Sequence, residues 1–170
     1  FPYTTLFRSV ELRDVEELDF GSLEGTARPP RGVLRFTVPL GPRRALLVYG
    51  VHLKSNWGDP GRNESKRYHA VRLLLEDAEA VRRRETTVAW ETLVLGDMNF
   101  DPSELRHARE PVNRLFEGWV DLWERARGEP RVTVPTREGG RFGGQPAVAF
   151  DRIYASPELM RAPWIAGIPR

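Results

Sequence analysis

The sequence has 170 residues, of which 40% are hydrophobic and 29% charged, and its formal net charge is +2. These proportions are typical of a globular domain with its own core, and they exclude a chain that is disordered throughout. The absence of cysteine excludes disulfides, thiolate metal sites and cysteine nucleophiles. The longest apolar run, residues 45–51, is too short to span a bilayer.

Both ends of the chain have unusual sequences. Residues 1–9, FPYTTLFRS, read as the translation of a common sequencing-library adapter, so we predict that they are not native and leave them out of the fold. A short N-terminal strand is the alternative, because these residues include good strand formers. The first methionine is Met98, and the last residues, APWIAGIPR, contain no cap or charged tail. We therefore expect residues 10–170 to be an incomplete domain of a longer protein.

The first half of the chain predicts a β-hairpin followed by a helix. Residues 10–30 are polar and end in a loop signature, so we expect no strand there. The segments 33–38 and 45–53 predict two antiparallel strands joined by the turn LGPRR, the second largely buried. Apolar residues three and four apart predict a helix over 64–84, with Asn63 as its cap.

The second half alternates strands with helical or loop segments. TLVLGD at 92–97 predicts a third strand, and residues 147–156 predict a fourth after a Gly-rich loop at 138–146. Apolar spacing predicts a helix near 112–126, although Gly118 weakens it. Strands joined partly by hairpins and partly by helices indicate a mixed α/β layer rather than a purely parallel sheet.

The third strand ends in three oxygen-bearing side chains, Asp97, Asn99 and Asp101, for which there are three interpretations. Their spacing matches the start of an EF-hand calcium loop, but Pro102 and Ala108 occupy the positions of the turn glycine and the bidentate glutamate. A tight turn needs nothing further, because all three are turn residues. The third interpretation is one half of a phosphoryl-transfer site.

Two other strands also carry side chains of the types that are common in catalytic sites. His52 ends the strand at 45–53, and Asp151 lies inside the strand at 147–156, where a carboxylate is costly unless it is paired. Each has a simpler interpretation: His52 as a core or edge histidine, and Asp151 as an ion pair with Arg152. Three strands that each supply such a side chain are less expected by chance than one, which favours a common site.

The segments YGVHLKS, VLGDMNFDP and AFDRIYAS occur in this order and resemble the endonuclease/exonuclease/phosphatase superfamily. The resemblance covers about residues 31–160, and its most specific element is G-D-x-N after an apolar strand. It implies a four-layer α/β/β/α sandwich with mixed, largely antiparallel sheets, of which this chain carries the middle and later part.

The resemblance also implies roles for four residues. His52 would contact the scissile phosphate, and Asp97 would position or deprotonate the attacking water with a possible metal contact. Asn99 would bind a phosphate oxygen or lie beside the metal, and Asp151 would pair with a C-terminal histidine or lie near the metal. Hydrolysis of an anionic ester needs a cation and a base, and carboxylate and amide oxygens suit Mg²⁺ or Mn²⁺.

The sequence departs from the family at two places. No glutamate matches the family's main metal ligand, because Glu11, Glu16, Glu17 and Glu24 lie in polar segments where we expect no strand, and no histidine follows Asp151. We therefore expect a metal-dependent phosphoesterase as the parent and an inactive fragment as this chain. The substrate would be a nucleic acid, a phospholipid head group or a sugar phosphate. The alternative is a catalytically silent domain that serves as a binding or scaffold module.

Lesser candidates surround these residues. We expect His69 and His107 to be solvated. Trp57 could stack on a substrate, but packing within its loop is the simpler interpretation. Arg67 and Asn63 could organise the loop beneath the site, and the simpler interpretations of these two residues are a surface ion pair and a helix cap.

Overall fold

The computed structural model describes residues 10–19, 28–125, 133 and 148–161. The strands, in chain order, are β1 (Arg13–Leu18), β2 (Val33–Gly41), β3 (Arg44–His52), β4 (Ala89–Asp97), β5 (Val120–Asp121) and β6 (Asp151–Ala155). The helices are α1 (Pro60–Arg84), α2 (Val112–Leu115), α3 (Leu122–Arg125) and α4 (Pro157–Arg161). The predicted adapter segment and the predicted loop at 138–146 lie outside the described residues. No helix in the described ranges is long and apolar enough to cross a membrane.

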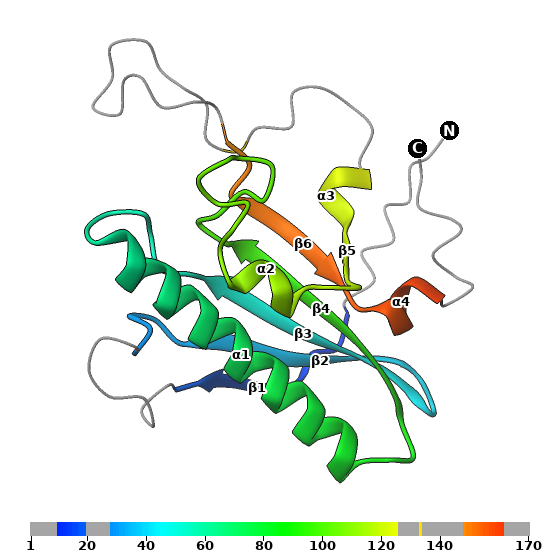
Figure 1. The fold of residues 1–170 in the computed structure, drawn as a ribbon. Coiled ribbons are helices and arrows are strands. Elements are labelled where there is room, and N and C mark those ends of the chain that lie inside the picture. The colour runs from blue at the N-terminus through cyan, green and yellow to red at the C-terminus, as the bar shows by residue number, and fades with distance from the viewer. Residues whose placement is uncertain (1–9, 20–27, 126–132, 134–147, 162–170) are drawn as a thin grey trace, which may run out of the picture.

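The described strands form one mixed sheet in the order β1-β2-β3-β4-β6-β5, with α1 lying across one face (Figure 1). Only the β3–β4 pair is parallel, and the other four pairs are antiparallel. The predicted α/β class with a mixed, largely antiparallel sheet is confirmed. Helix α1 makes the crossover between β3 and β4, as parallel neighbours require.

The predicted hairpin is confirmed, but the prediction of no strand before residue 30 is wrong. Strand β1 pairs with β2 at the edge of the sheet, and Glu16 and Glu17 lie within it. Nearly every β1 side chain is exposed, so the strand lacks the apolar alternation by which strands are recognised. Asp14 has a left-handed backbone, φ +49°, within the irregular part of the pairing.

Helix α1 begins earlier than predicted, and Asp59 is its cap. The Asp59 carboxylate accepts a hydrogen bond from the Arg62 N–H at 2.8 Å, and Pro60 takes the first helical position. The predicted cap, Asn63, is instead buried in the first turns, where its amide donates to the Trp57 carbonyl.

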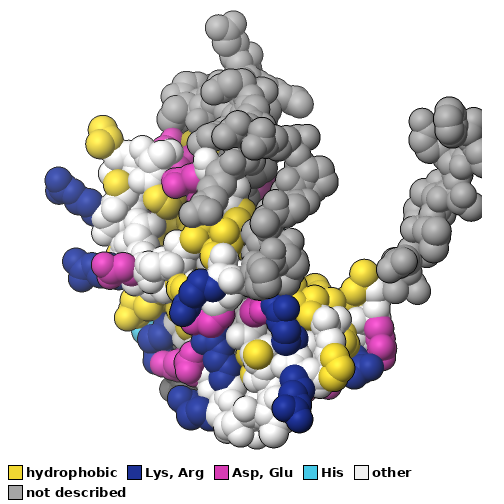
Figure 2. Space-filling view, turned by 90° about the vertical axis from the view of Figure 1, so that its right-hand side faces the viewer, with side chains coloured by type: hydrophobic (Ala, Val, Ile, Leu, Met, Phe, Trp, Pro, Cys, Tyr) yellow, Lys and Arg dark blue, Asp and Glu magenta, His cyan; other side chains and the backbone are white. Residues whose placement is uncertain are grey.

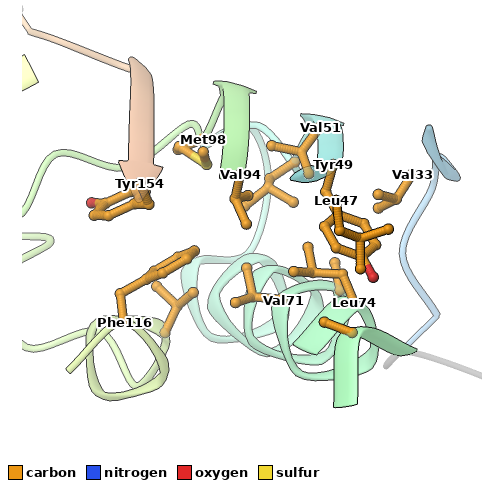
Figure 3. Packing of buried hydrophobic residues seen from close by; sticks show 14 of the residues in the cluster. Val33, Leu47, Tyr49, Val51, Val71, Leu74, Val94, Met98, Phe116 and Tyr154 are labelled. Carbon is orange, nitrogen blue, oxygen red and sulfur yellow. The ribbon is translucent and has the colours of Figure 1, made fainter. Parts of the chain in front are cut away.

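The core lies between α1 and the sheet. Val71 and Leu74 of the helix pack against inward side chains of β2, β3 and β4, and Phe116 stacks on Tyr154 at 4.0 Å between ring centroids (Figure 3). Val33, Arg35 and Thr37 are the inward set of β2, although two of them are polar. The alternating apolar residues of β2, Leu34, Phe36 and Val38, therefore lie on the other face of the sheet, where Leu34 is 46% exposed.

The predicted helix near 112–126 is wrong. Residues 112–125 instead form the short α2, the two-residue β5 and the short α3. Helix α2 ends at Leu115, and Gly118, with a φ of +82°, then turns the chain back toward the sheet. Strand β5 then pairs with β6, because Val120 and Asp121 reach Ala155 and Tyr154.

The face of the sheet opposite α1 carries an open pocket of about 750 Å³. Its lining includes Leu34, Gly50, Leu95 and His52. The described residues place one helix layer on one sheet, so the predicted four-layer arrangement stays a prediction.

Candidate active site

Three of the four predicted site residues occupy one row across the sheet. His52 is the register partner of Asp97 on the parallel neighbour β4, and Asp97 is the register partner of Asp151 on the antiparallel neighbour β6. The carboxyl ends of β3 and β4 and the first residue of β6 therefore meet at one edge of the sheet. Register partners point to the same face, so the three side chains lie side by side on the face opposite α1.

Gly96 allows this row to form. A Cβ at Gly96 would lie 2.1 Å from the Val51 carbonyl oxygen, and the glycine has a φ of +129°. Any other residue would push β4 away from β3 at the step before Asp97. Directly after the row, the Leu53 N–H donates to the Asp97 carbonyl at 2.8 Å and keeps the two strand ends together.

The Asp97 carboxylate is oriented by groups on both sides. Its Oδ1 accepts a hydrogen bond from the Asn99 N–H at 2.9 Å, and its Oδ2 lies 3.4 Å from His52 Nε2, within ion-pairing distance. The half-exposed His52 side chain and the one-third exposed Asp97 side chain leave the pair open to a ligand.

Asn99 is buried behind Asp97 in a constrained conformation. Its φ is +54°, in the left-handed region that asparagine tolerates better than most residues. The side-chain Nδ2 donates to the Leu53 carbonyl at 3.2 Å, which links the loop after β4 to the loop after β3. The structure therefore brings all four predicted site residues to one place.

Asp151 is not paired with Arg152, so that simpler interpretation of Asp151 is wrong. Arg152 is buried and donates instead to Asp101 and Asp121, while the Asp151 side chain is exposed at the start of β6. Asp101 also accepts from the Ser103 N–H and hydroxyl and from the Ala149 N–H. Burial alone would raise the pKa of Asp101, but these hydrogen bonds and Arg152 hold it below its ordinary value. Asp101 therefore joins the β4 loop to β6 and is not a third open ligand.

Positive charge gathers beside His52. Burial lowers the pKa of the Lys54 ammonium, and the neighbouring cations Lys66, Arg67 and Arg31 lower it further. Arg31 lines the same pocket as His52 and donates to the Leu53 carbonyl at 3.3 Å. The side of the molecule turned to the viewer in Figure 2 instead shows basic and acidic side chains interspersed. Arg31 and Lys54 therefore place positive charge beside the carboxylates of Asp97 and Asp151.

A buried polar cluster lies behind the site, of which sequence reasoning singled out Arg67 but missed Glu110 and the burial of His107. The interpretation of Arg67 as one half of a surface ion pair is wrong. Arg67 is 2% exposed and binds Glu110, and His107 next to them is 3% exposed, so the prediction that His107 is solvated is wrong. Burial and the cations Arg106 and Arg67 lower the pKa of His107 to about 4. The wide spacing of these residues in the chain leaves no local pattern to detect. Trp57, expected to pack within its loop, is 68% exposed.

The described part of the chain contains no group of three or more His, Cys, Asp or Glu side chains placed to hold a metal. Asp97 and Asp151 of the row, with Asn99 behind Asp97, are the oxygen donors at this edge of the sheet. Glu17 of β1 lines the same open pocket as His52.

No protein-family model matches the chain, and no curated protein matches its sequence. Solved structures do match. Truncated TDP2 from Caenorhabditis elegans is 14% identical with a TM-score of 0.55, and the match covers 86% of this chain and 53% of that chain. TDP2 from D. rerio, complexed with a single strand DNA product, is 18% identical with a TM-score of 0.54, and the match covers 91% of this chain and 56% of that chain. Sphingomyelinase C from Streptomyces griseocarneus is 15% identical with a TM-score of 0.55, and the match covers 78% of this chain and 44% of that chain.

At these identities the matches show the fold alone. The chain has the fold of the endonuclease/exonuclease/phosphatase superfamily, as the three quoted segments predicted. It spans about half the length of the solved structures that it matches. A shared fold does not establish a shared reaction, so function is argued from the site.

Proposed function

We propose that the protein containing this chain hydrolyses a phosphate ester by in-line attack of water, assisted by a divalent cation. The observation that supports the proposal most is the row of His52, Asp97 and Asp151 across three neighbouring strands, with Asn99 directly behind Asp97. The similar structures include TDP2 with a single strand DNA product and a sphingomyelinase. Esters of nucleic acids, of phospholipid head groups and of sugars are therefore the substrates to compare.

His52, Asp97 and Asn99 each have a task that their surroundings permit. The exposed imidazole of His52 can donate a hydrogen bond to a phosphoryl oxygen as negative charge develops there. Asp97 is held through Oδ1, so its other oxygen can align a water and accept its proton. Asn99 uses one amide hydrogen for Leu53 and keeps its second hydrogen and its oxygen for the ligand.

The donors present fit a hard divalent cation. Asp97 and Asp151 are like charges at directly paired positions, an arrangement that is unfavourable by itself and that a cation would reverse. Mg²⁺ and Mn²⁺ prefer carboxylate and amide oxygens, so Asp97, Asn99 and Asp151 could hold one side of such an ion. When bound, the ion would neutralise phosphoryl oxygens.

We propose that this chain alone is inactive. The family resemblance implies a glutamate as the main metal ligand and a C-terminal histidine. Among the described residues no group of three or more His, Cys, Asp or Glu side chains is placed to hold a metal, and no histidine follows Asp151 in the sequence. The row would then supply the water-orienting side of the site, while the missing ligand would supply most of the cation affinity.

The test uses the full reading frame from which this chain is taken. The purified protein should hydrolyse a generic diester such as bis(p-nitrophenyl) phosphate with Mg²⁺ or Mn²⁺, and EDTA should abolish the activity. Asp97→Ala should lower kcat about a thousandfold, because the base that orients the water is lost. Glu76→Ala, which removes an exposed carboxylate from α1, is the control and should stay at the wild-type rate.

An Asp97→Ala protein as active as wild type would refute the assignment. A full-length protein that binds phosphate esters without turnover, with or without added cation, would instead support a binding or scaffold module.

A further inference from the structure

Arg67 stands out among the buried groups that the proposed reaction does not use. It is the largest fully buried side chain in the described part of the molecule, although it carries a full charge. A buried guanidinium is costly unless its N–H groups are satisfied. Arg67 donates to Glu110 twice, at 2.9 and 2.7 Å, to the Lys54 carbonyl at 2.8 Å and to Asn56 Oδ1 at 3.1 Å.

The partners of Arg67 lie in the loops that carry the site, and none of them is in the sheet. Lys54 and Asn56 belong to the loop that follows His52, and Glu110 belongs to the segment between β4 and α2. Asn63, one turn earlier on the same face of α1, holds this loop as well, because its amide donates to the Trp57 carbonyl at 3.1 Å. Packing α1 against the sheet would not require these contacts.

Asn56 connects Arg67 with Asn99 of the site. Its Oδ1 accepts from Arg67, which turns the amide so that Nδ2 donates to the Asn99 carbonyl at 3.0 Å. Asn99 is then bonded through its carbonyl, its N–H and its side chain, to Asn56, Asp97 and Leu53 respectively. These three hydrogen bonds hold the left-handed backbone of Asn99 in one conformation.

We infer that Arg67 is a positioning residue that acts through Asn56 to hold Asn99, and with it the orientation of Asp97. Arg67 touches none of the reacting groups, since its polar contacts end at Glu110, Lys54 and Asn56. The catalytic consequence rests on the proposed function. The structural consequence, a held Asn99, does not.

Asn56→Asp separates positioning from stability. The variant keeps an oxygen that accepts from Arg67, and a carboxylate accepts more strongly than an amide. It also puts an oxygen opposite the Asn99 carbonyl, where a donor is needed, so the contact becomes repulsive. The melting temperature should stay within about 4 °C of wild type, while the turn at Asn99 loosens.

Amide hydrogen exchange on this 170-residue chain is the primary measurement, because it does not depend on activity. The Asn99 amide should exchange at least about tenfold faster in Asn56→Asp, with the amides of Tyr49 and Val94 in the central strands unchanged. Asn63→Ala is the matched control: it removes a hydrogen bond from the same helix to the same loop, but not one on the path to Asn99. Its Asn99 amide should exchange at the wild-type rate.

In the full-length protein, Asn56→Asp should lower kcat by about 10–100-fold and leave KM within roughly threefold. A wild-type full-length protein without hydrolytic activity would refute the proposed function and leave the exchange measurement to decide on Arg67. An unchanged Asn99 exchange rate in a folded Asn56→Asp protein would overturn the inference. Should Asn56→Asp lose protection throughout the sheet, Asn56→Ala, which removes both hydrogen bonds without adding charge, decides by the same measurement.

Discussion

Two buried arginines connect α1 with the rest of the molecule, and they do so in different surroundings. Arg35 of β2 donates to both oxygens of Asp77 on α1, at 2.9 and 3.0 Å, and the Tyr49 hydroxyl of β3 donates to the same carboxylate at 2.7 Å. Arg67 of α1 donates to both oxygens of Glu110 and to groups of the loop after β3. The Arg35 cluster joins regular elements, whereas the Arg67 cluster joins loops that carry the site.

The difference shows that similar ion pairs can serve the fold or the site. Around Arg35, helix and strands already have a geometry set by backbone hydrogen bonds and apolar packing, so the pair adds energy to an arrangement determined elsewhere. Around Arg67, the loops have no regular backbone hydrogen bonds of their own, so side-chain hydrogen bonds fix the positions of the loops. Burial also differs: the Asp77 side chain is 24% exposed and the Glu110 side chain 1%. Burial accordingly raises the pKa of Glu110, although Arg67 opposes the shift.

The largest expected effect comes from removing one acid at a time. Glu110→Ala leaves the Arg67 guanidinium buried without its carboxylate and should lower the free energy of unfolding by about 3–5 kcal/mol. Asp77→Ala should cost less, about 1–3 kcal/mol, because water reaches this carboxylate and can solvate Arg35. Urea denaturation monitored by circular dichroism measures both.

Replacing each whole pair sharpens the comparison. Arg35→Met with Asp77→Leu should recover most of the lost stability and leave Asn99 amide exchange at the wild-type rate. Arg67→Met with Glu110→Leu should also recover stability, because packed apolar side chains can replace a buried ion pair. Its Asn99 amide should nevertheless exchange faster. Equal Asn99 exchange in the two double variants would remove the distinction between the clusters.

The next effect is a pH dependence carried by the Arg67 cluster, where His107 Nε2 lies 3.7 Å from Glu110. His107 has a pKa of about 4 in the fold, below its ordinary value of 6.5, so the unfolded chain binds this proton first as the pH falls. The histidine's contribution therefore lowers stability progressively from pH 6.5 to about 4, by roughly 3 kcal/mol in total. His107→Asn, whose amide oxygen can still accept from the Asp101 N–H, should lack this slope.

Urea midpoints of wild type and His107→Asn between pH 4 and 7 give the difference curve. Subtracting the midpoints of His107→Asn from those of wild type removes the contribution of Glu110, which is present in both proteins. That contribution has the opposite sign, because the raised pKa of Glu110 stabilises the folded state as the pH falls. A difference curve that is flat over this range would show that His107 is not held neutral.

The smallest expected effect comes from an exposed pair on the same helix. Arg72 and Glu76 are an i,i+4 pair, with side chains 35% and 55% exposed. Arg72→Ala should change the free energy of unfolding by no more than about 0.5 kcal/mol, because solvent screens the pair and ordering it costs side-chain entropy. A loss as large as that of Glu110→Ala would mean that burial does not separate these pairs.

Local sequence patterns were sufficient for much of the fold. The hairpin and α1 follow from alternation and helical periodicity, and both are confirmed. Strand β1 was missed because an exposed edge strand has no apolar face to reveal it. The helix predicted near 112–126 failed because apolar residues at helical spacing also suit a short helix and a two-residue strand when Gly118 turns the chain.

The sequence by itself determined which residues stand at the strand ends: His52, Asp97 with Asn99, and Asp151 follow or begin apolar runs that must be buried. Tertiary structure alone decided that they form one row, because register depends on how distant segments pair. It also decided that Arg152 forms an ion pair with Asp101 rather than with the adjacent Asp151. It likewise assembled the Arg67 cluster, in which Arg67 and Glu110 are 43 residues apart along the chain. Burial sets the energy of such contacts, and burial is a property of the folded chain.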